Sequence, residues 1–317
     1  MSVVVTIVGP TAIGKTRLSV ELAKILPLEI VSADSRQIYR FLDIATAKPP
    51  RDVLDKIPHH LIDFLRPDEY FSAGRYSQVG RKVIEQIFKR HRVPVIVGGS
   101  GLYIQALLDG LSNVEIRDEK IRQSLRHRMA VEGIEKLYLQ LLEIDPVLAT
   151  RIPKNDKQRI IRGLEVYLKT GKRLSEVQEV EMKPADFTAL IYGLNGAREW
   201  LYQKINRRVE EMLHQGLLAE AANLKFKGYG LHLNALNTVG YKEVFNYLDN
   251  KIDYDTMIEL IKQNTRKYAK RQLTWFRKDK RISWIEVGET SDFAKIAQEI
   301  AGIYNNCTKS HKVTQRK

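Results

Sequence analysis

The chain has 317 residues, 44% of them hydrophobic, which is enough to bury the core of one large domain or of two smaller ones. It has no apolar run of about 18 residues, the length of a membrane-spanning helix, and it begins without a basic leader, so we expect a cytoplasmic protein with no membrane partner. Its single cysteine, Cys307, excludes an internal disulfide framework and a cysteine-based zinc site.

The formal net charge of +14 indicates a polyanionic partner, because clustered Lys and Arg gain affinity by displacing counterions from phosphates. The excess is uneven: residues 113–317 hold 37 basic and 27 acidic side chains, a net charge of +10. The second part of the chain is therefore where we expect the polyanion to bind. The charge alone favours such a partner, although a soluble basic protein without one has the same composition.

The first hundred residues alternate short apolar runs with helical patterns. The runs Val3–Val8, Leu28–Ala33 and Val93–Val97 are largely apolar, and a helical pattern covers about Lys15–Leu26. Strands of this kind are buried on both faces, which predicts an α/β fold with a parallel sheet flanked by helices. Ligands of such sheets bind beyond the carboxyl ends of the strands.

A phosphate-binding loop (P-loop) lies between the first strand and the first helix. Its sequence fits G-x-x-x-x-G-K-[ST] and comprises Gly9, Pro10, Thr11, Ala12, Ile13, Gly14, Lys15 and Thr16. The glycines let backbone N–H groups turn inward around an oxyanion, the helix N-terminus adds partial positive charge, and Lys15 adds a full charge. Thr16 is placed to ligate Mg²⁺, and by motif alone the loop is also an ATP site.

The carboxylate with which P-loop NTPases hold Mg²⁺ is missing from its usual place. In those enzymes another buried strand ends in an Asp. Here the strand at Pro94–Val97 runs into the sequence GGSG (98–101), which has no acidic residue. Asp63 could substitute, but its short stretch lies between two prolines and is more typical of a structural or loop-capping Asp. The motif therefore indicates phosphate binding more firmly than ATP hydrolysis.

Asp34 follows the second strand directly, in the sequence ADSRQIY (33–39). The parallel sheet places it at the same edge as the P-loop. A carboxylate beside a phosphate site can accept a proton from a nucleophile. It can equally cap the next helix, and its position alone does not decide between these two roles.

From about Asn113 to Asp186 the pattern is helical, which predicts a helical insertion domain at residues 113–186. Asp118 is placed to cap one helix, and a second helix over Asp156–Thr170 is expected to stop at Gly171. The second part of the chain then continues with a strand and long helices, predicted at Phe187–Leu194, Arg198–Leu213, Leu217–Phe226 and about Met257–Arg277.

Residues 1–112 and 187–317 are thus predicted to form one P-loop core with a helical C-terminal part. Between Arg266 and Arg281, eight of the sixteen residues are Lys or Arg, and aromatic residues lie among them. This density is typical of a segment that binds a nucleic-acid backbone. Two of the aromatics, Trp275 and Phe276, are more typical of the core face of an amphipathic helix.

From end to end, over about residues 3–285, the sequence resembles the tRNA dimethylallyltransferase family. The resemblance is carried, in the family's order, by GPTAIGKT, SADSRQIY, GGSGLYI, NDKQRIIRGLEVYLKTG, INRRVEEML, VGYKE and NTRKYAKRQLTWFRK. The P-loop is shared with many enzymes, but the second and last strings are specific. One departure is Ser100, where some members have Thr, and it keeps the hydroxyl.

The resemblance implies that the P-loop holds dimethylallyl diphosphate and that Mg²⁺ binds at Thr16. The dimethylallyl group passes to the exocyclic amine of the adenosine 3′ of the anticodon in tRNA, and diphosphate leaves. Asp34 takes the amine proton, while Lys15, Thr11, Ser100 and Arg208 stabilise the leaving diphosphate. Without the resemblance, Arg208 would read as a solvated helix charge.

The resemblance also implies a monomer that binds a tRNA anticodon stem-loop with the target base flipped out of the stack. Part of this binding falls in the insertion domain. The residues it assigns to RNA binding are Asp34, Ser35, Arg36, Gln37, Gln158, Arg159, Ile160, Ile161, Arg162, Lys270 and Arg271. From spacing alone, the insertion residues would be a solvated helix face.

Three other functions remain open on sequence. A kinase could bind ATP at the same loop and use Asp34 to activate a hydroxyl, although this leaves the basic second half unexplained. A non-catalytic RNA-binding module would not need Lys15, Thr16 and Asp34 together. A transferase acting on free AMP or ADP would have no use for the basic helices.

Overall fold

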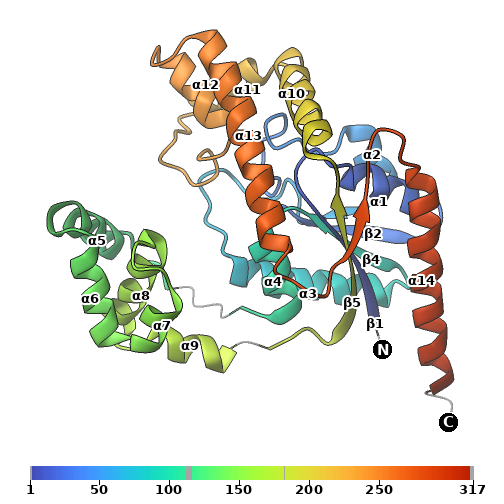
Figure 1. The fold of residues 1–317 in the computed structure, drawn as a ribbon, viewed down its shortest axis with the longest axis horizontal. Coiled ribbons are helices and arrows are strands. Elements are labelled where there is room, and N and C mark those ends of the chain that lie inside the picture. The colour runs from blue at the N-terminus through green and yellow to red at the C-terminus, as the bar shows by residue number, and fades with distance from the viewer. Residues whose placement is uncertain (1, 112–115, 182, 315–317) are drawn as a thin grey trace. The chain divides into compact units, whose positions relative to one another are not determined.

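The computed structural model describes residues 2–111, 116–181 and 183–314, and the chain divides into two compact units (Figure 1). The core unit comprises Met1–Phe71, Gln78–Ile104 and Ala185–Lys317, and the insertion unit comprises Ser72–Ser77 and Gln105–Pro184. In the parts of the chain that are described, no helix is long and apolar enough to cross a membrane.

The boundary predicted between residues 112 and 113 lies instead after Ile104, and the insertion unit also includes Ser72–Ser77. One reason is a buried hydrogen bond of 2.6 Å from the Ser77 hydroxyl to the carbonyl of Ala106, which joins these two segments. The second boundary lies after Pro184, two residues before the predicted position.

The core unit is built on a six-stranded sheet in the order β3-β2-β4-β1-β5-β6, with every neighbouring pair parallel. This confirms the predicted α/β fold. The strands are β1 (Ser2–Val8), β2 (Leu28–Ala33), β3 (His59–His60), β4 (Val93–Gly98), β5 (Phe187–Asn195) and β6 (Ser283–Glu286). The predicted strands all form, whereas β3 and β6 are short edge strands that the apolar pattern does not mark.

The register aligns the carboxyl ends of the central strands. Gly98 at the end of β4 pairs with Val8 of β1 and with Ala33 of β2. Val8 also pairs with Gly193 of β5. The loops that leave β1, β2 and β4 therefore begin at the same level, which brings three predicted motifs to one edge of the sheet.

The helices of the core unit cover the sheet and extend beyond it. They are α1 (Lys15–Ala23), α2 (Arg51–Lys56), α3 (Ala73–Lys89), α4 (Gly101–Asp109), α10 (Arg198–His214), α11 (Leu217–Phe226), α12 (Tyr241–Leu248), α13 (Tyr254–Phe276) and α14 (Phe293–Thr314), of which α3 and α4 also contribute to the insertion unit. Helices α1 and α14 lie side by side next to the sheet, where Leu18, Leu22 and Ile300 are part of the core (Figure 1).

The insertion unit is helical, as the sequence predicts. Its helices are α5 (Glu119–Glu132), α6 (Ile134–Ile144), α7 (Pro146–Arg151), α8 (Lys157–Thr170) and α9 (Leu174–Glu181). The predicted helix ends are confirmed: the Asp118 carboxylate accepts hydrogen bonds from two backbone N–H groups of α5, and Gly171 ends α8 with a φ of 70°. Leu137, Leu141 and Leu164 are fully buried at its centre.

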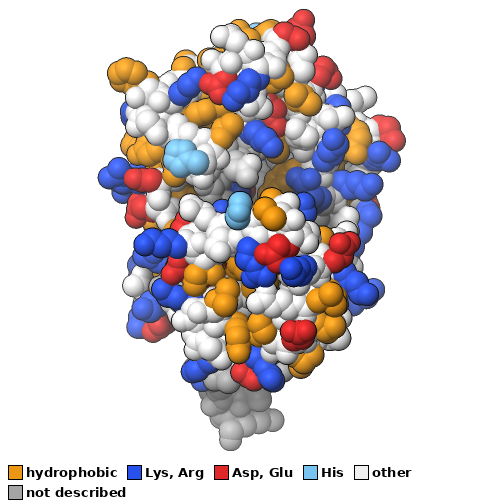
Figure 2. Space-filling view, turned by 90° about the vertical axis from the view of Figure 1, so that its left-hand side faces the viewer, with side chains coloured by type: hydrophobic (Ala, Val, Ile, Leu, Met, Phe, Trp, Pro, Cys, Tyr) orange, Lys and Arg blue, Asp and Glu red, His pale blue; other side chains and the backbone are white. Residues whose placement is uncertain are grey.

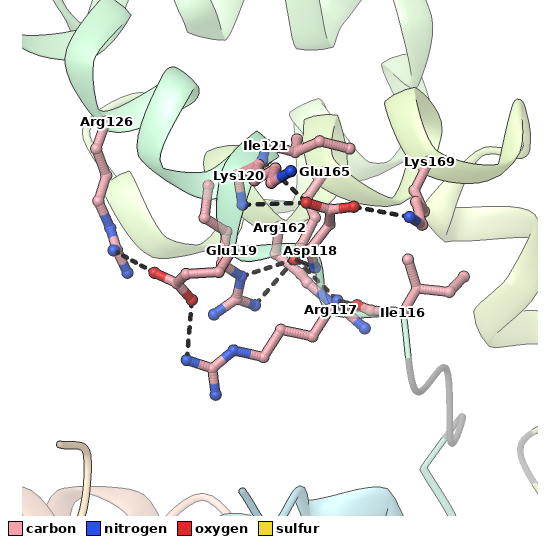
Figure 3. Close-up of polar contacts among 11 residues, drawn as sticks. Ile116, Arg117, Asp118, Glu119, Lys120, Ile121, Arg126, Arg162, Glu165 and Lys169 are labelled. Carbon is pink, nitrogen blue, oxygen red and sulfur yellow. Dashed lines mark hydrogen bonds and ion pairs between the residues drawn. The ribbon is translucent and has the colours of Figure 1, made fainter.

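A buried carboxylate joins α5 to α8 (Figure 3). Glu165 has no exposed surface and accepts a two-point contact from Arg122, at 2.7 and 2.9 Å, together with a bond from Arg162 at 2.9 Å. Its Oε1 also accepts the Asp118 N–H at 2.9 Å. Burial alone raises the pKa of Glu165, but these donors outweigh it and leave the pKa below its ordinary value.

Replacing Glu165 with Gln should lower the free energy of unfolding of the insertion unit by about 2–4 kcal/mol, because two guanidinium groups lose their charged partner. A carboxylate whose pKa is lowered by folding stabilises the folded state fully above its unfolded pKa, which is about 4.3 for Glu. This stabilisation is lost as the pH falls through the lower pKa of the folded state. The difference between wild type and Glu165→Gln in thermal denaturation should therefore be largest at neutral pH and shrink in acid. The exposed Glu143→Gln is the matched control, and a Glu165 variant as stable as that control would contradict the assignment.

Candidate active site

The candidate site lies at the carboxyl ends of β1, β2 and β4. The P-loop (residues 9–16) follows β1, a turn that begins at Asp34 follows β2, and the sequence GGSG (98–101) includes the end of β4. The structure thus brings together three motifs that the sequence separates by some ninety residues.

The P-loop has the backbone geometry of an oxyanion cradle. Gly9 and Gly14 have φ angles of 146° and 112°, and Ala12 has a φ of 64°, all in the left-handed region. A Cβ at Gly9 would lie 2.8 Å from the Leu194 carbonyl oxygen, so a side chain there would displace the loop. Successive turns of this kind point N–H groups toward a common centre.

Two cations lie at the P-loop. The Lys15 Nζ donates to the carbonyl oxygens of Gly9 and Pro10 at 2.9 and 2.7 Å, and the Arg208 Nη1 donates to the Thr11 hydroxyl at 3.1 Å. Burial lowers the pKa of Lys15 to about 7; the carboxylate of Asp34 opposes this and Arg208 adds to it. Burial likewise lowers the pKa of Arg208. Two desolvated cations, one of which lowers the pKa of the other, form a site that an anion would stabilise.

Asp34 caps the turn after β2, and its role as a proton acceptor stays a prediction. Its Oδ1 accepts the backbone N–H groups of Arg36 at 2.8 Å and Gln37 at 3.3 Å, so the carboxylate closes the turn after β2. It also acts electrostatically on Lys15 and Arg208. The carboxylate is only partly buried and stands next to the cationic loop.

Hydroxyl groups connect the turn after β2 to the end of β4. The Ser100 Oγ accepts the Ser35 N–H at 2.9 Å and donates to the Ser35 Oγ at 3.2 Å. The Tyr268 hydroxyl, from α13, hydrogen-bonds with Ser100. Burial, with Asp34 as the next cause, raises the pKa of Tyr268. Ser100, assigned to the diphosphate by resemblance, thus bonds to Ser35 and Tyr268 in this structure.

Two neighbouring residues assigned to RNA binding hold loops in place. The Arg36 guanidinium donates to the Asn234 carbonyl. The Gln37 amide donates to the carbonyls of Thr46 and Ala47, each at 3.0 Å. Both side chains therefore contribute to the shape of the loops around Asp34.

Gln272 belongs to the site, and the site prediction from sequence missed it. It lies on α13 with 6% of its surface exposed; its Oε1 accepts the Thr11 N–H at 2.8 Å and its Nε2 donates to the Gly99 carbonyl at 2.9 Å. A Cβ at Gly99 would lie 2.1 Å from that Nε2, and one at Gly101 would lie 2.2 Å from the Trp275 ring. The glycines of GGSG thus make room for α13.

The basic and aromatic residues near the end of α13 differ in exposure. Lys270 and Arg271 are exposed, and the Arg271 guanidinium lies 5.8 Å from the centre of the Tyr268 ring. The expectation of core positions is confirmed for Phe276, which is 3% exposed. Trp275 packs on Gly101 but keeps 38% of its surface exposed, so the expectation of a core position is wrong for Trp275.

The insertion residues assigned to RNA binding divide into two groups. Gln158 and Arg159 are exposed on α8. Ile160 is fully buried in the core of the insertion unit, and Ile161 packs against that core. The Ile160 side chain is therefore not exposed for a contact with RNA, and the assignment of this residue to RNA binding stays a prediction. Arg162 donates to the Ile116 carbonyl and to Glu165, so it supports the fold of α8 (Figure 3).

A pocket of about 550 Å³ opens beside Thr16 and Arg208. Its wall includes Asp63, which has a φ of 55° and forms an ion pair of 2.7 Å with the buried Lys48 Nζ. Within the described residues, no group of three or more His, Cys, Asp or Glu side chains could hold a metal ion. Thr16, at the start of α1, is exposed and lines this pocket.

The basic excess of the composition is visible at the surface. Figure 2 shows one face on which Lys and Arg side chains are spread widely, with fewer Asp and Glu side chains between them. A surface of this kind attracts polyanions over distances of about 10 Å at moderate ionic strength.

Comparisons with known proteins place the chain among transferases of one family. A family model described as IPP transferase matches residues 37–279. The tRNA dimethylallyltransferase 1 of Syntrophotalea carbinolica is 46% identical over 298 residues, which is 94% of each protein. The tRNA dimethylallyltransferase of Thermotoga neapolitana is 48% identical over 277 residues, 87% of this chain and 90% of that protein.

Solved structures agree. The full-length tRNA isopentenylpyrophosphate transferase of Bacillus halodurans is 37% identical, with a TM-score of 0.71 over 98% of this chain and 99% of that chain. A eukaryotic dimethylallyltransferase studied acting on tRNA is 29% identical, with a TM-score of 0.79 over 98% of this chain and 80% of that chain. The resemblance seen in the motifs is thereby confirmed, and the chain belongs to the IPP transferase family, the family of the tRNA dimethylallyltransferases.

Proposed function

We propose that this protein is a prenyltransferase that moves a dimethylallyl group from dimethylallyl diphosphate to the exocyclic amine of the adenosine 3′ of the anticodon in tRNA, releasing diphosphate. The observation that carries the proposal is the pairing of a cationic P-loop with the carboxylate of Asp34, in a chain that matches tRNA dimethylallyltransferases over nearly its full length. The proposal assigns the chain to the cytoplasm as a monomer.

The diphosphate end of the donor fits the P-loop. Backbone N–H groups of residues 12–16, the ammonium of Lys15 and the guanidinium of Arg208 supply the donors. The Thr11 hydroxyl accepts from Arg208, and the Thr11 N–H is held by Gln272. A bound diphosphate raises the pKa of Lys15 above its unliganded value, so the lysine is fully charged when the donor is bound. The end of β4 carries no carboxylate, which also favours a diphosphate over a hydrolysed triphosphate.

Mg²⁺ fits Thr16 in this proposal. Mg²⁺ commonly keeps several waters and binds through one or two protein oxygens together with substrate phosphates, and Thr16 offers one exposed hydroxyl beside the loop. When bound, the ion supplies charge neutralisation on the leaving diphosphate.

In the transfer step, the bond between the allylic carbon and the diphosphate oxygen breaks, and its electron pair stays on that oxygen. Lys15 and Arg208 stabilise the new negative charge, and their desolvation strengthens the effect. The amine nitrogen forms the new bond to carbon and gives up one proton, which Asp34 accepts. Because its Oδ1 is fixed by the turn after β2, the carboxylate is held in one orientation for that transfer.

The acceptor adenine must leave its stack to reach Asp34, which costs a few kcal/mol that RNA contacts offset. On the core unit, the exposed Lys270 and Arg271 of α13 are the residues we assign to the RNA backbone. On the insertion unit, the exposed Gln158 and Arg159 take that role, and Arg162 holds α8 in place.

Asp34→Asn separates the two roles of this residue. The Asn oxygen can still accept from Arg36 and Gln37, so the turn is retained, but the amide cannot take a proton. Transfer of a labelled dimethylallyl group to an anticodon stem-loop should fall by at least about 100-fold, with unchanged stem-loop affinity. If wild type transfers no label, the proposed function is wrong; if Asp34→Asn transfers at the wild-type rate, Asp34 only caps the turn.

The lowered pKa of Lys15 makes diphosphate binding dependent on pH. Below its pKa of about 7 the unliganded Lys15 is already charged. Above that pKa, diphosphate binding must be accompanied by protonation of Lys15. The contribution of Lys15 to diphosphate affinity therefore falls by up to about tenfold per pH unit. The ratio of inorganic diphosphate affinities of wild type and Lys15→Met, measured by calorimetry from pH 6 to 9, isolates this effect from ionisation of the ligand. A ratio that does not change with pH would contradict the role of Lys15.

Replacing Lys270 and Arg271 with Ala should weaken stem-loop binding and reduce the slope of log affinity against log salt by about 1–2. The reason is that each phosphate contact releases counterions from the RNA, so fewer are released when contacts are lost. Fluorescence anisotropy over a range of salt concentrations measures both. The exposed Lys295 and Lys309 of α14, replaced in the same way, provide the control for net charge. An unchanged slope in the α13 variant would remove these two residues from the RNA contact.

A further inference from the structure

Consecutive residues of α13 face two different environments. Lys270 and Arg271 are exposed, and the next residue, Gln272, is buried against the P-loop. The assigned RNA contact and the donor site are therefore one residue apart on the same rigid helix, although Gln272 and Thr11 are separated by 261 positions in the chain.

The peptide group between Pro10 and Thr11 is the part of the loop that Gln272 holds. Its N–H donates to the Gln272 Oε1 at 2.8 Å, and its carbonyl, that of Pro10, accepts the Lys15 Nζ at 2.7 Å. A rotation of this peptide would therefore move the acceptor of Lys15 as well. The Gln272 Nε2 is fixed in turn by the Gly99 carbonyl at 2.9 Å, so the amide cannot turn without losing both bonds.

Helix α13 also supports the second cation of the site. The Arg266 Nη1 donates to the Asn206 Oδ1 at 2.7 Å, and Asn206 lies on α10 two residues before Arg208. Arg208 in turn donates to the Thr11 hydroxyl. Gln272 thus holds the backbone of Thr11 directly. The Thr11 side chain is held by Arg208 of α10, a helix that α13 contacts through Arg266.

We propose that Gln272 is a positioning residue that couples RNA binding on α13 to the geometry of the P-loop, so that a bound acceptor prepares the loop for the diphosphate of the donor. This proposal rests on the proposed function, because it takes Lys270 and Arg271 as RNA contacts. RNA bound to α13 restrains the helix and therefore the Gln272 amide on it. That amide holds the peptide between Pro10 and Thr11, whose carbonyl accepts the Lys15 ammonium. By linkage, a donor diphosphate must then strengthen RNA binding by the same factor.

The test measures binding of inorganic diphosphate to the full chain without RNA and with a saturating anticodon stem-loop. In wild type the stem-loop should tighten diphosphate binding by about 5- to 20-fold, within the usual range of coupling between two sites. In Gln272→Met, which keeps the length of the side chain but forms neither bond, the factor should fall to about one while stem-loop affinity alone changes less than about twofold. Gln263→Met, the same substitution at an exposed position of α13, should keep the wild-type factor.

A wild-type factor of one, or a wild-type factor retained in Gln272→Met, would overturn the proposal. Should Gln272→Met not fold, hydrogen exchange in the wild-type chain decides: the stem-loop should slow exchange of the Thr11 N–H, and unchanged exchange overturns the coupling. Label transfer by the same wild-type preparation separates the two proposals, because transfer without coupling contradicts only the role of Gln272.

Discussion

The site is organised around two desolvated cations, Lys15 of the P-loop and Arg208 of α10, which both contact that loop. Each has a pKa lowered by burial, and the carboxylate of Asp34 offsets only part of that cost. A site of this kind is stabilised when a diphosphate enters and again when charge develops on the leaving oxygen. In the proposed function, the same two cations bind the donor and serve the transfer step.

The fold supplies this arrangement through register and through glycine. Because Gly98 pairs with both Val8 and Ala33, the P-loop, Asp34 and Ser100 begin at one level of the sheet. The glycines on either side of Ser100 then make room for two side chains of α13. A Cβ at Gly99 would exclude Gln272, and one at Gly101 would exclude Trp275. A helix that carries exposed basic residues is thereby packed directly on the loop proposed to bind the donor.

The sequence predicted the features that depend on residues close to one another in the chain. The apolar strands and the helix ends at Asp118 and Gly171 all depend on residues close in sequence, and the structure confirms them. The two-residue β3 was not predictable because it has no apolar pattern of its own and pairs only through β2. Gln272 was missed because its partners, Thr11 and Gly99, are far away in the chain.

A resemblance also carries residues over without regard to burial. It assigned five consecutive residues of α8 to RNA, yet a helix turns each position by about 100°, so the segment must include a buried one. Ile160 is that residue, and Arg162 forms an ion pair with the buried Glu165. The sequence did mark Gln158 and Arg159 correctly as a polar face, because the hydrophobic period alone places them away from the core.

The central claim is that the P-loop holds a prenyl diphosphate whose carbon is attacked by an adenine at Asp34. A crystal structure of the full chain grown with a non-reactive dimethylallyl diphosphate analogue, an anticodon stem-loop and excess ATP tests it most directly. The account predicts the analogue's diphosphate in the loop against Lys15 and Arg208, with the adenine amine at the Asp34 carboxylate. ATP in the loop, with its γ-phosphate directed toward a small metabolite, would contradict it.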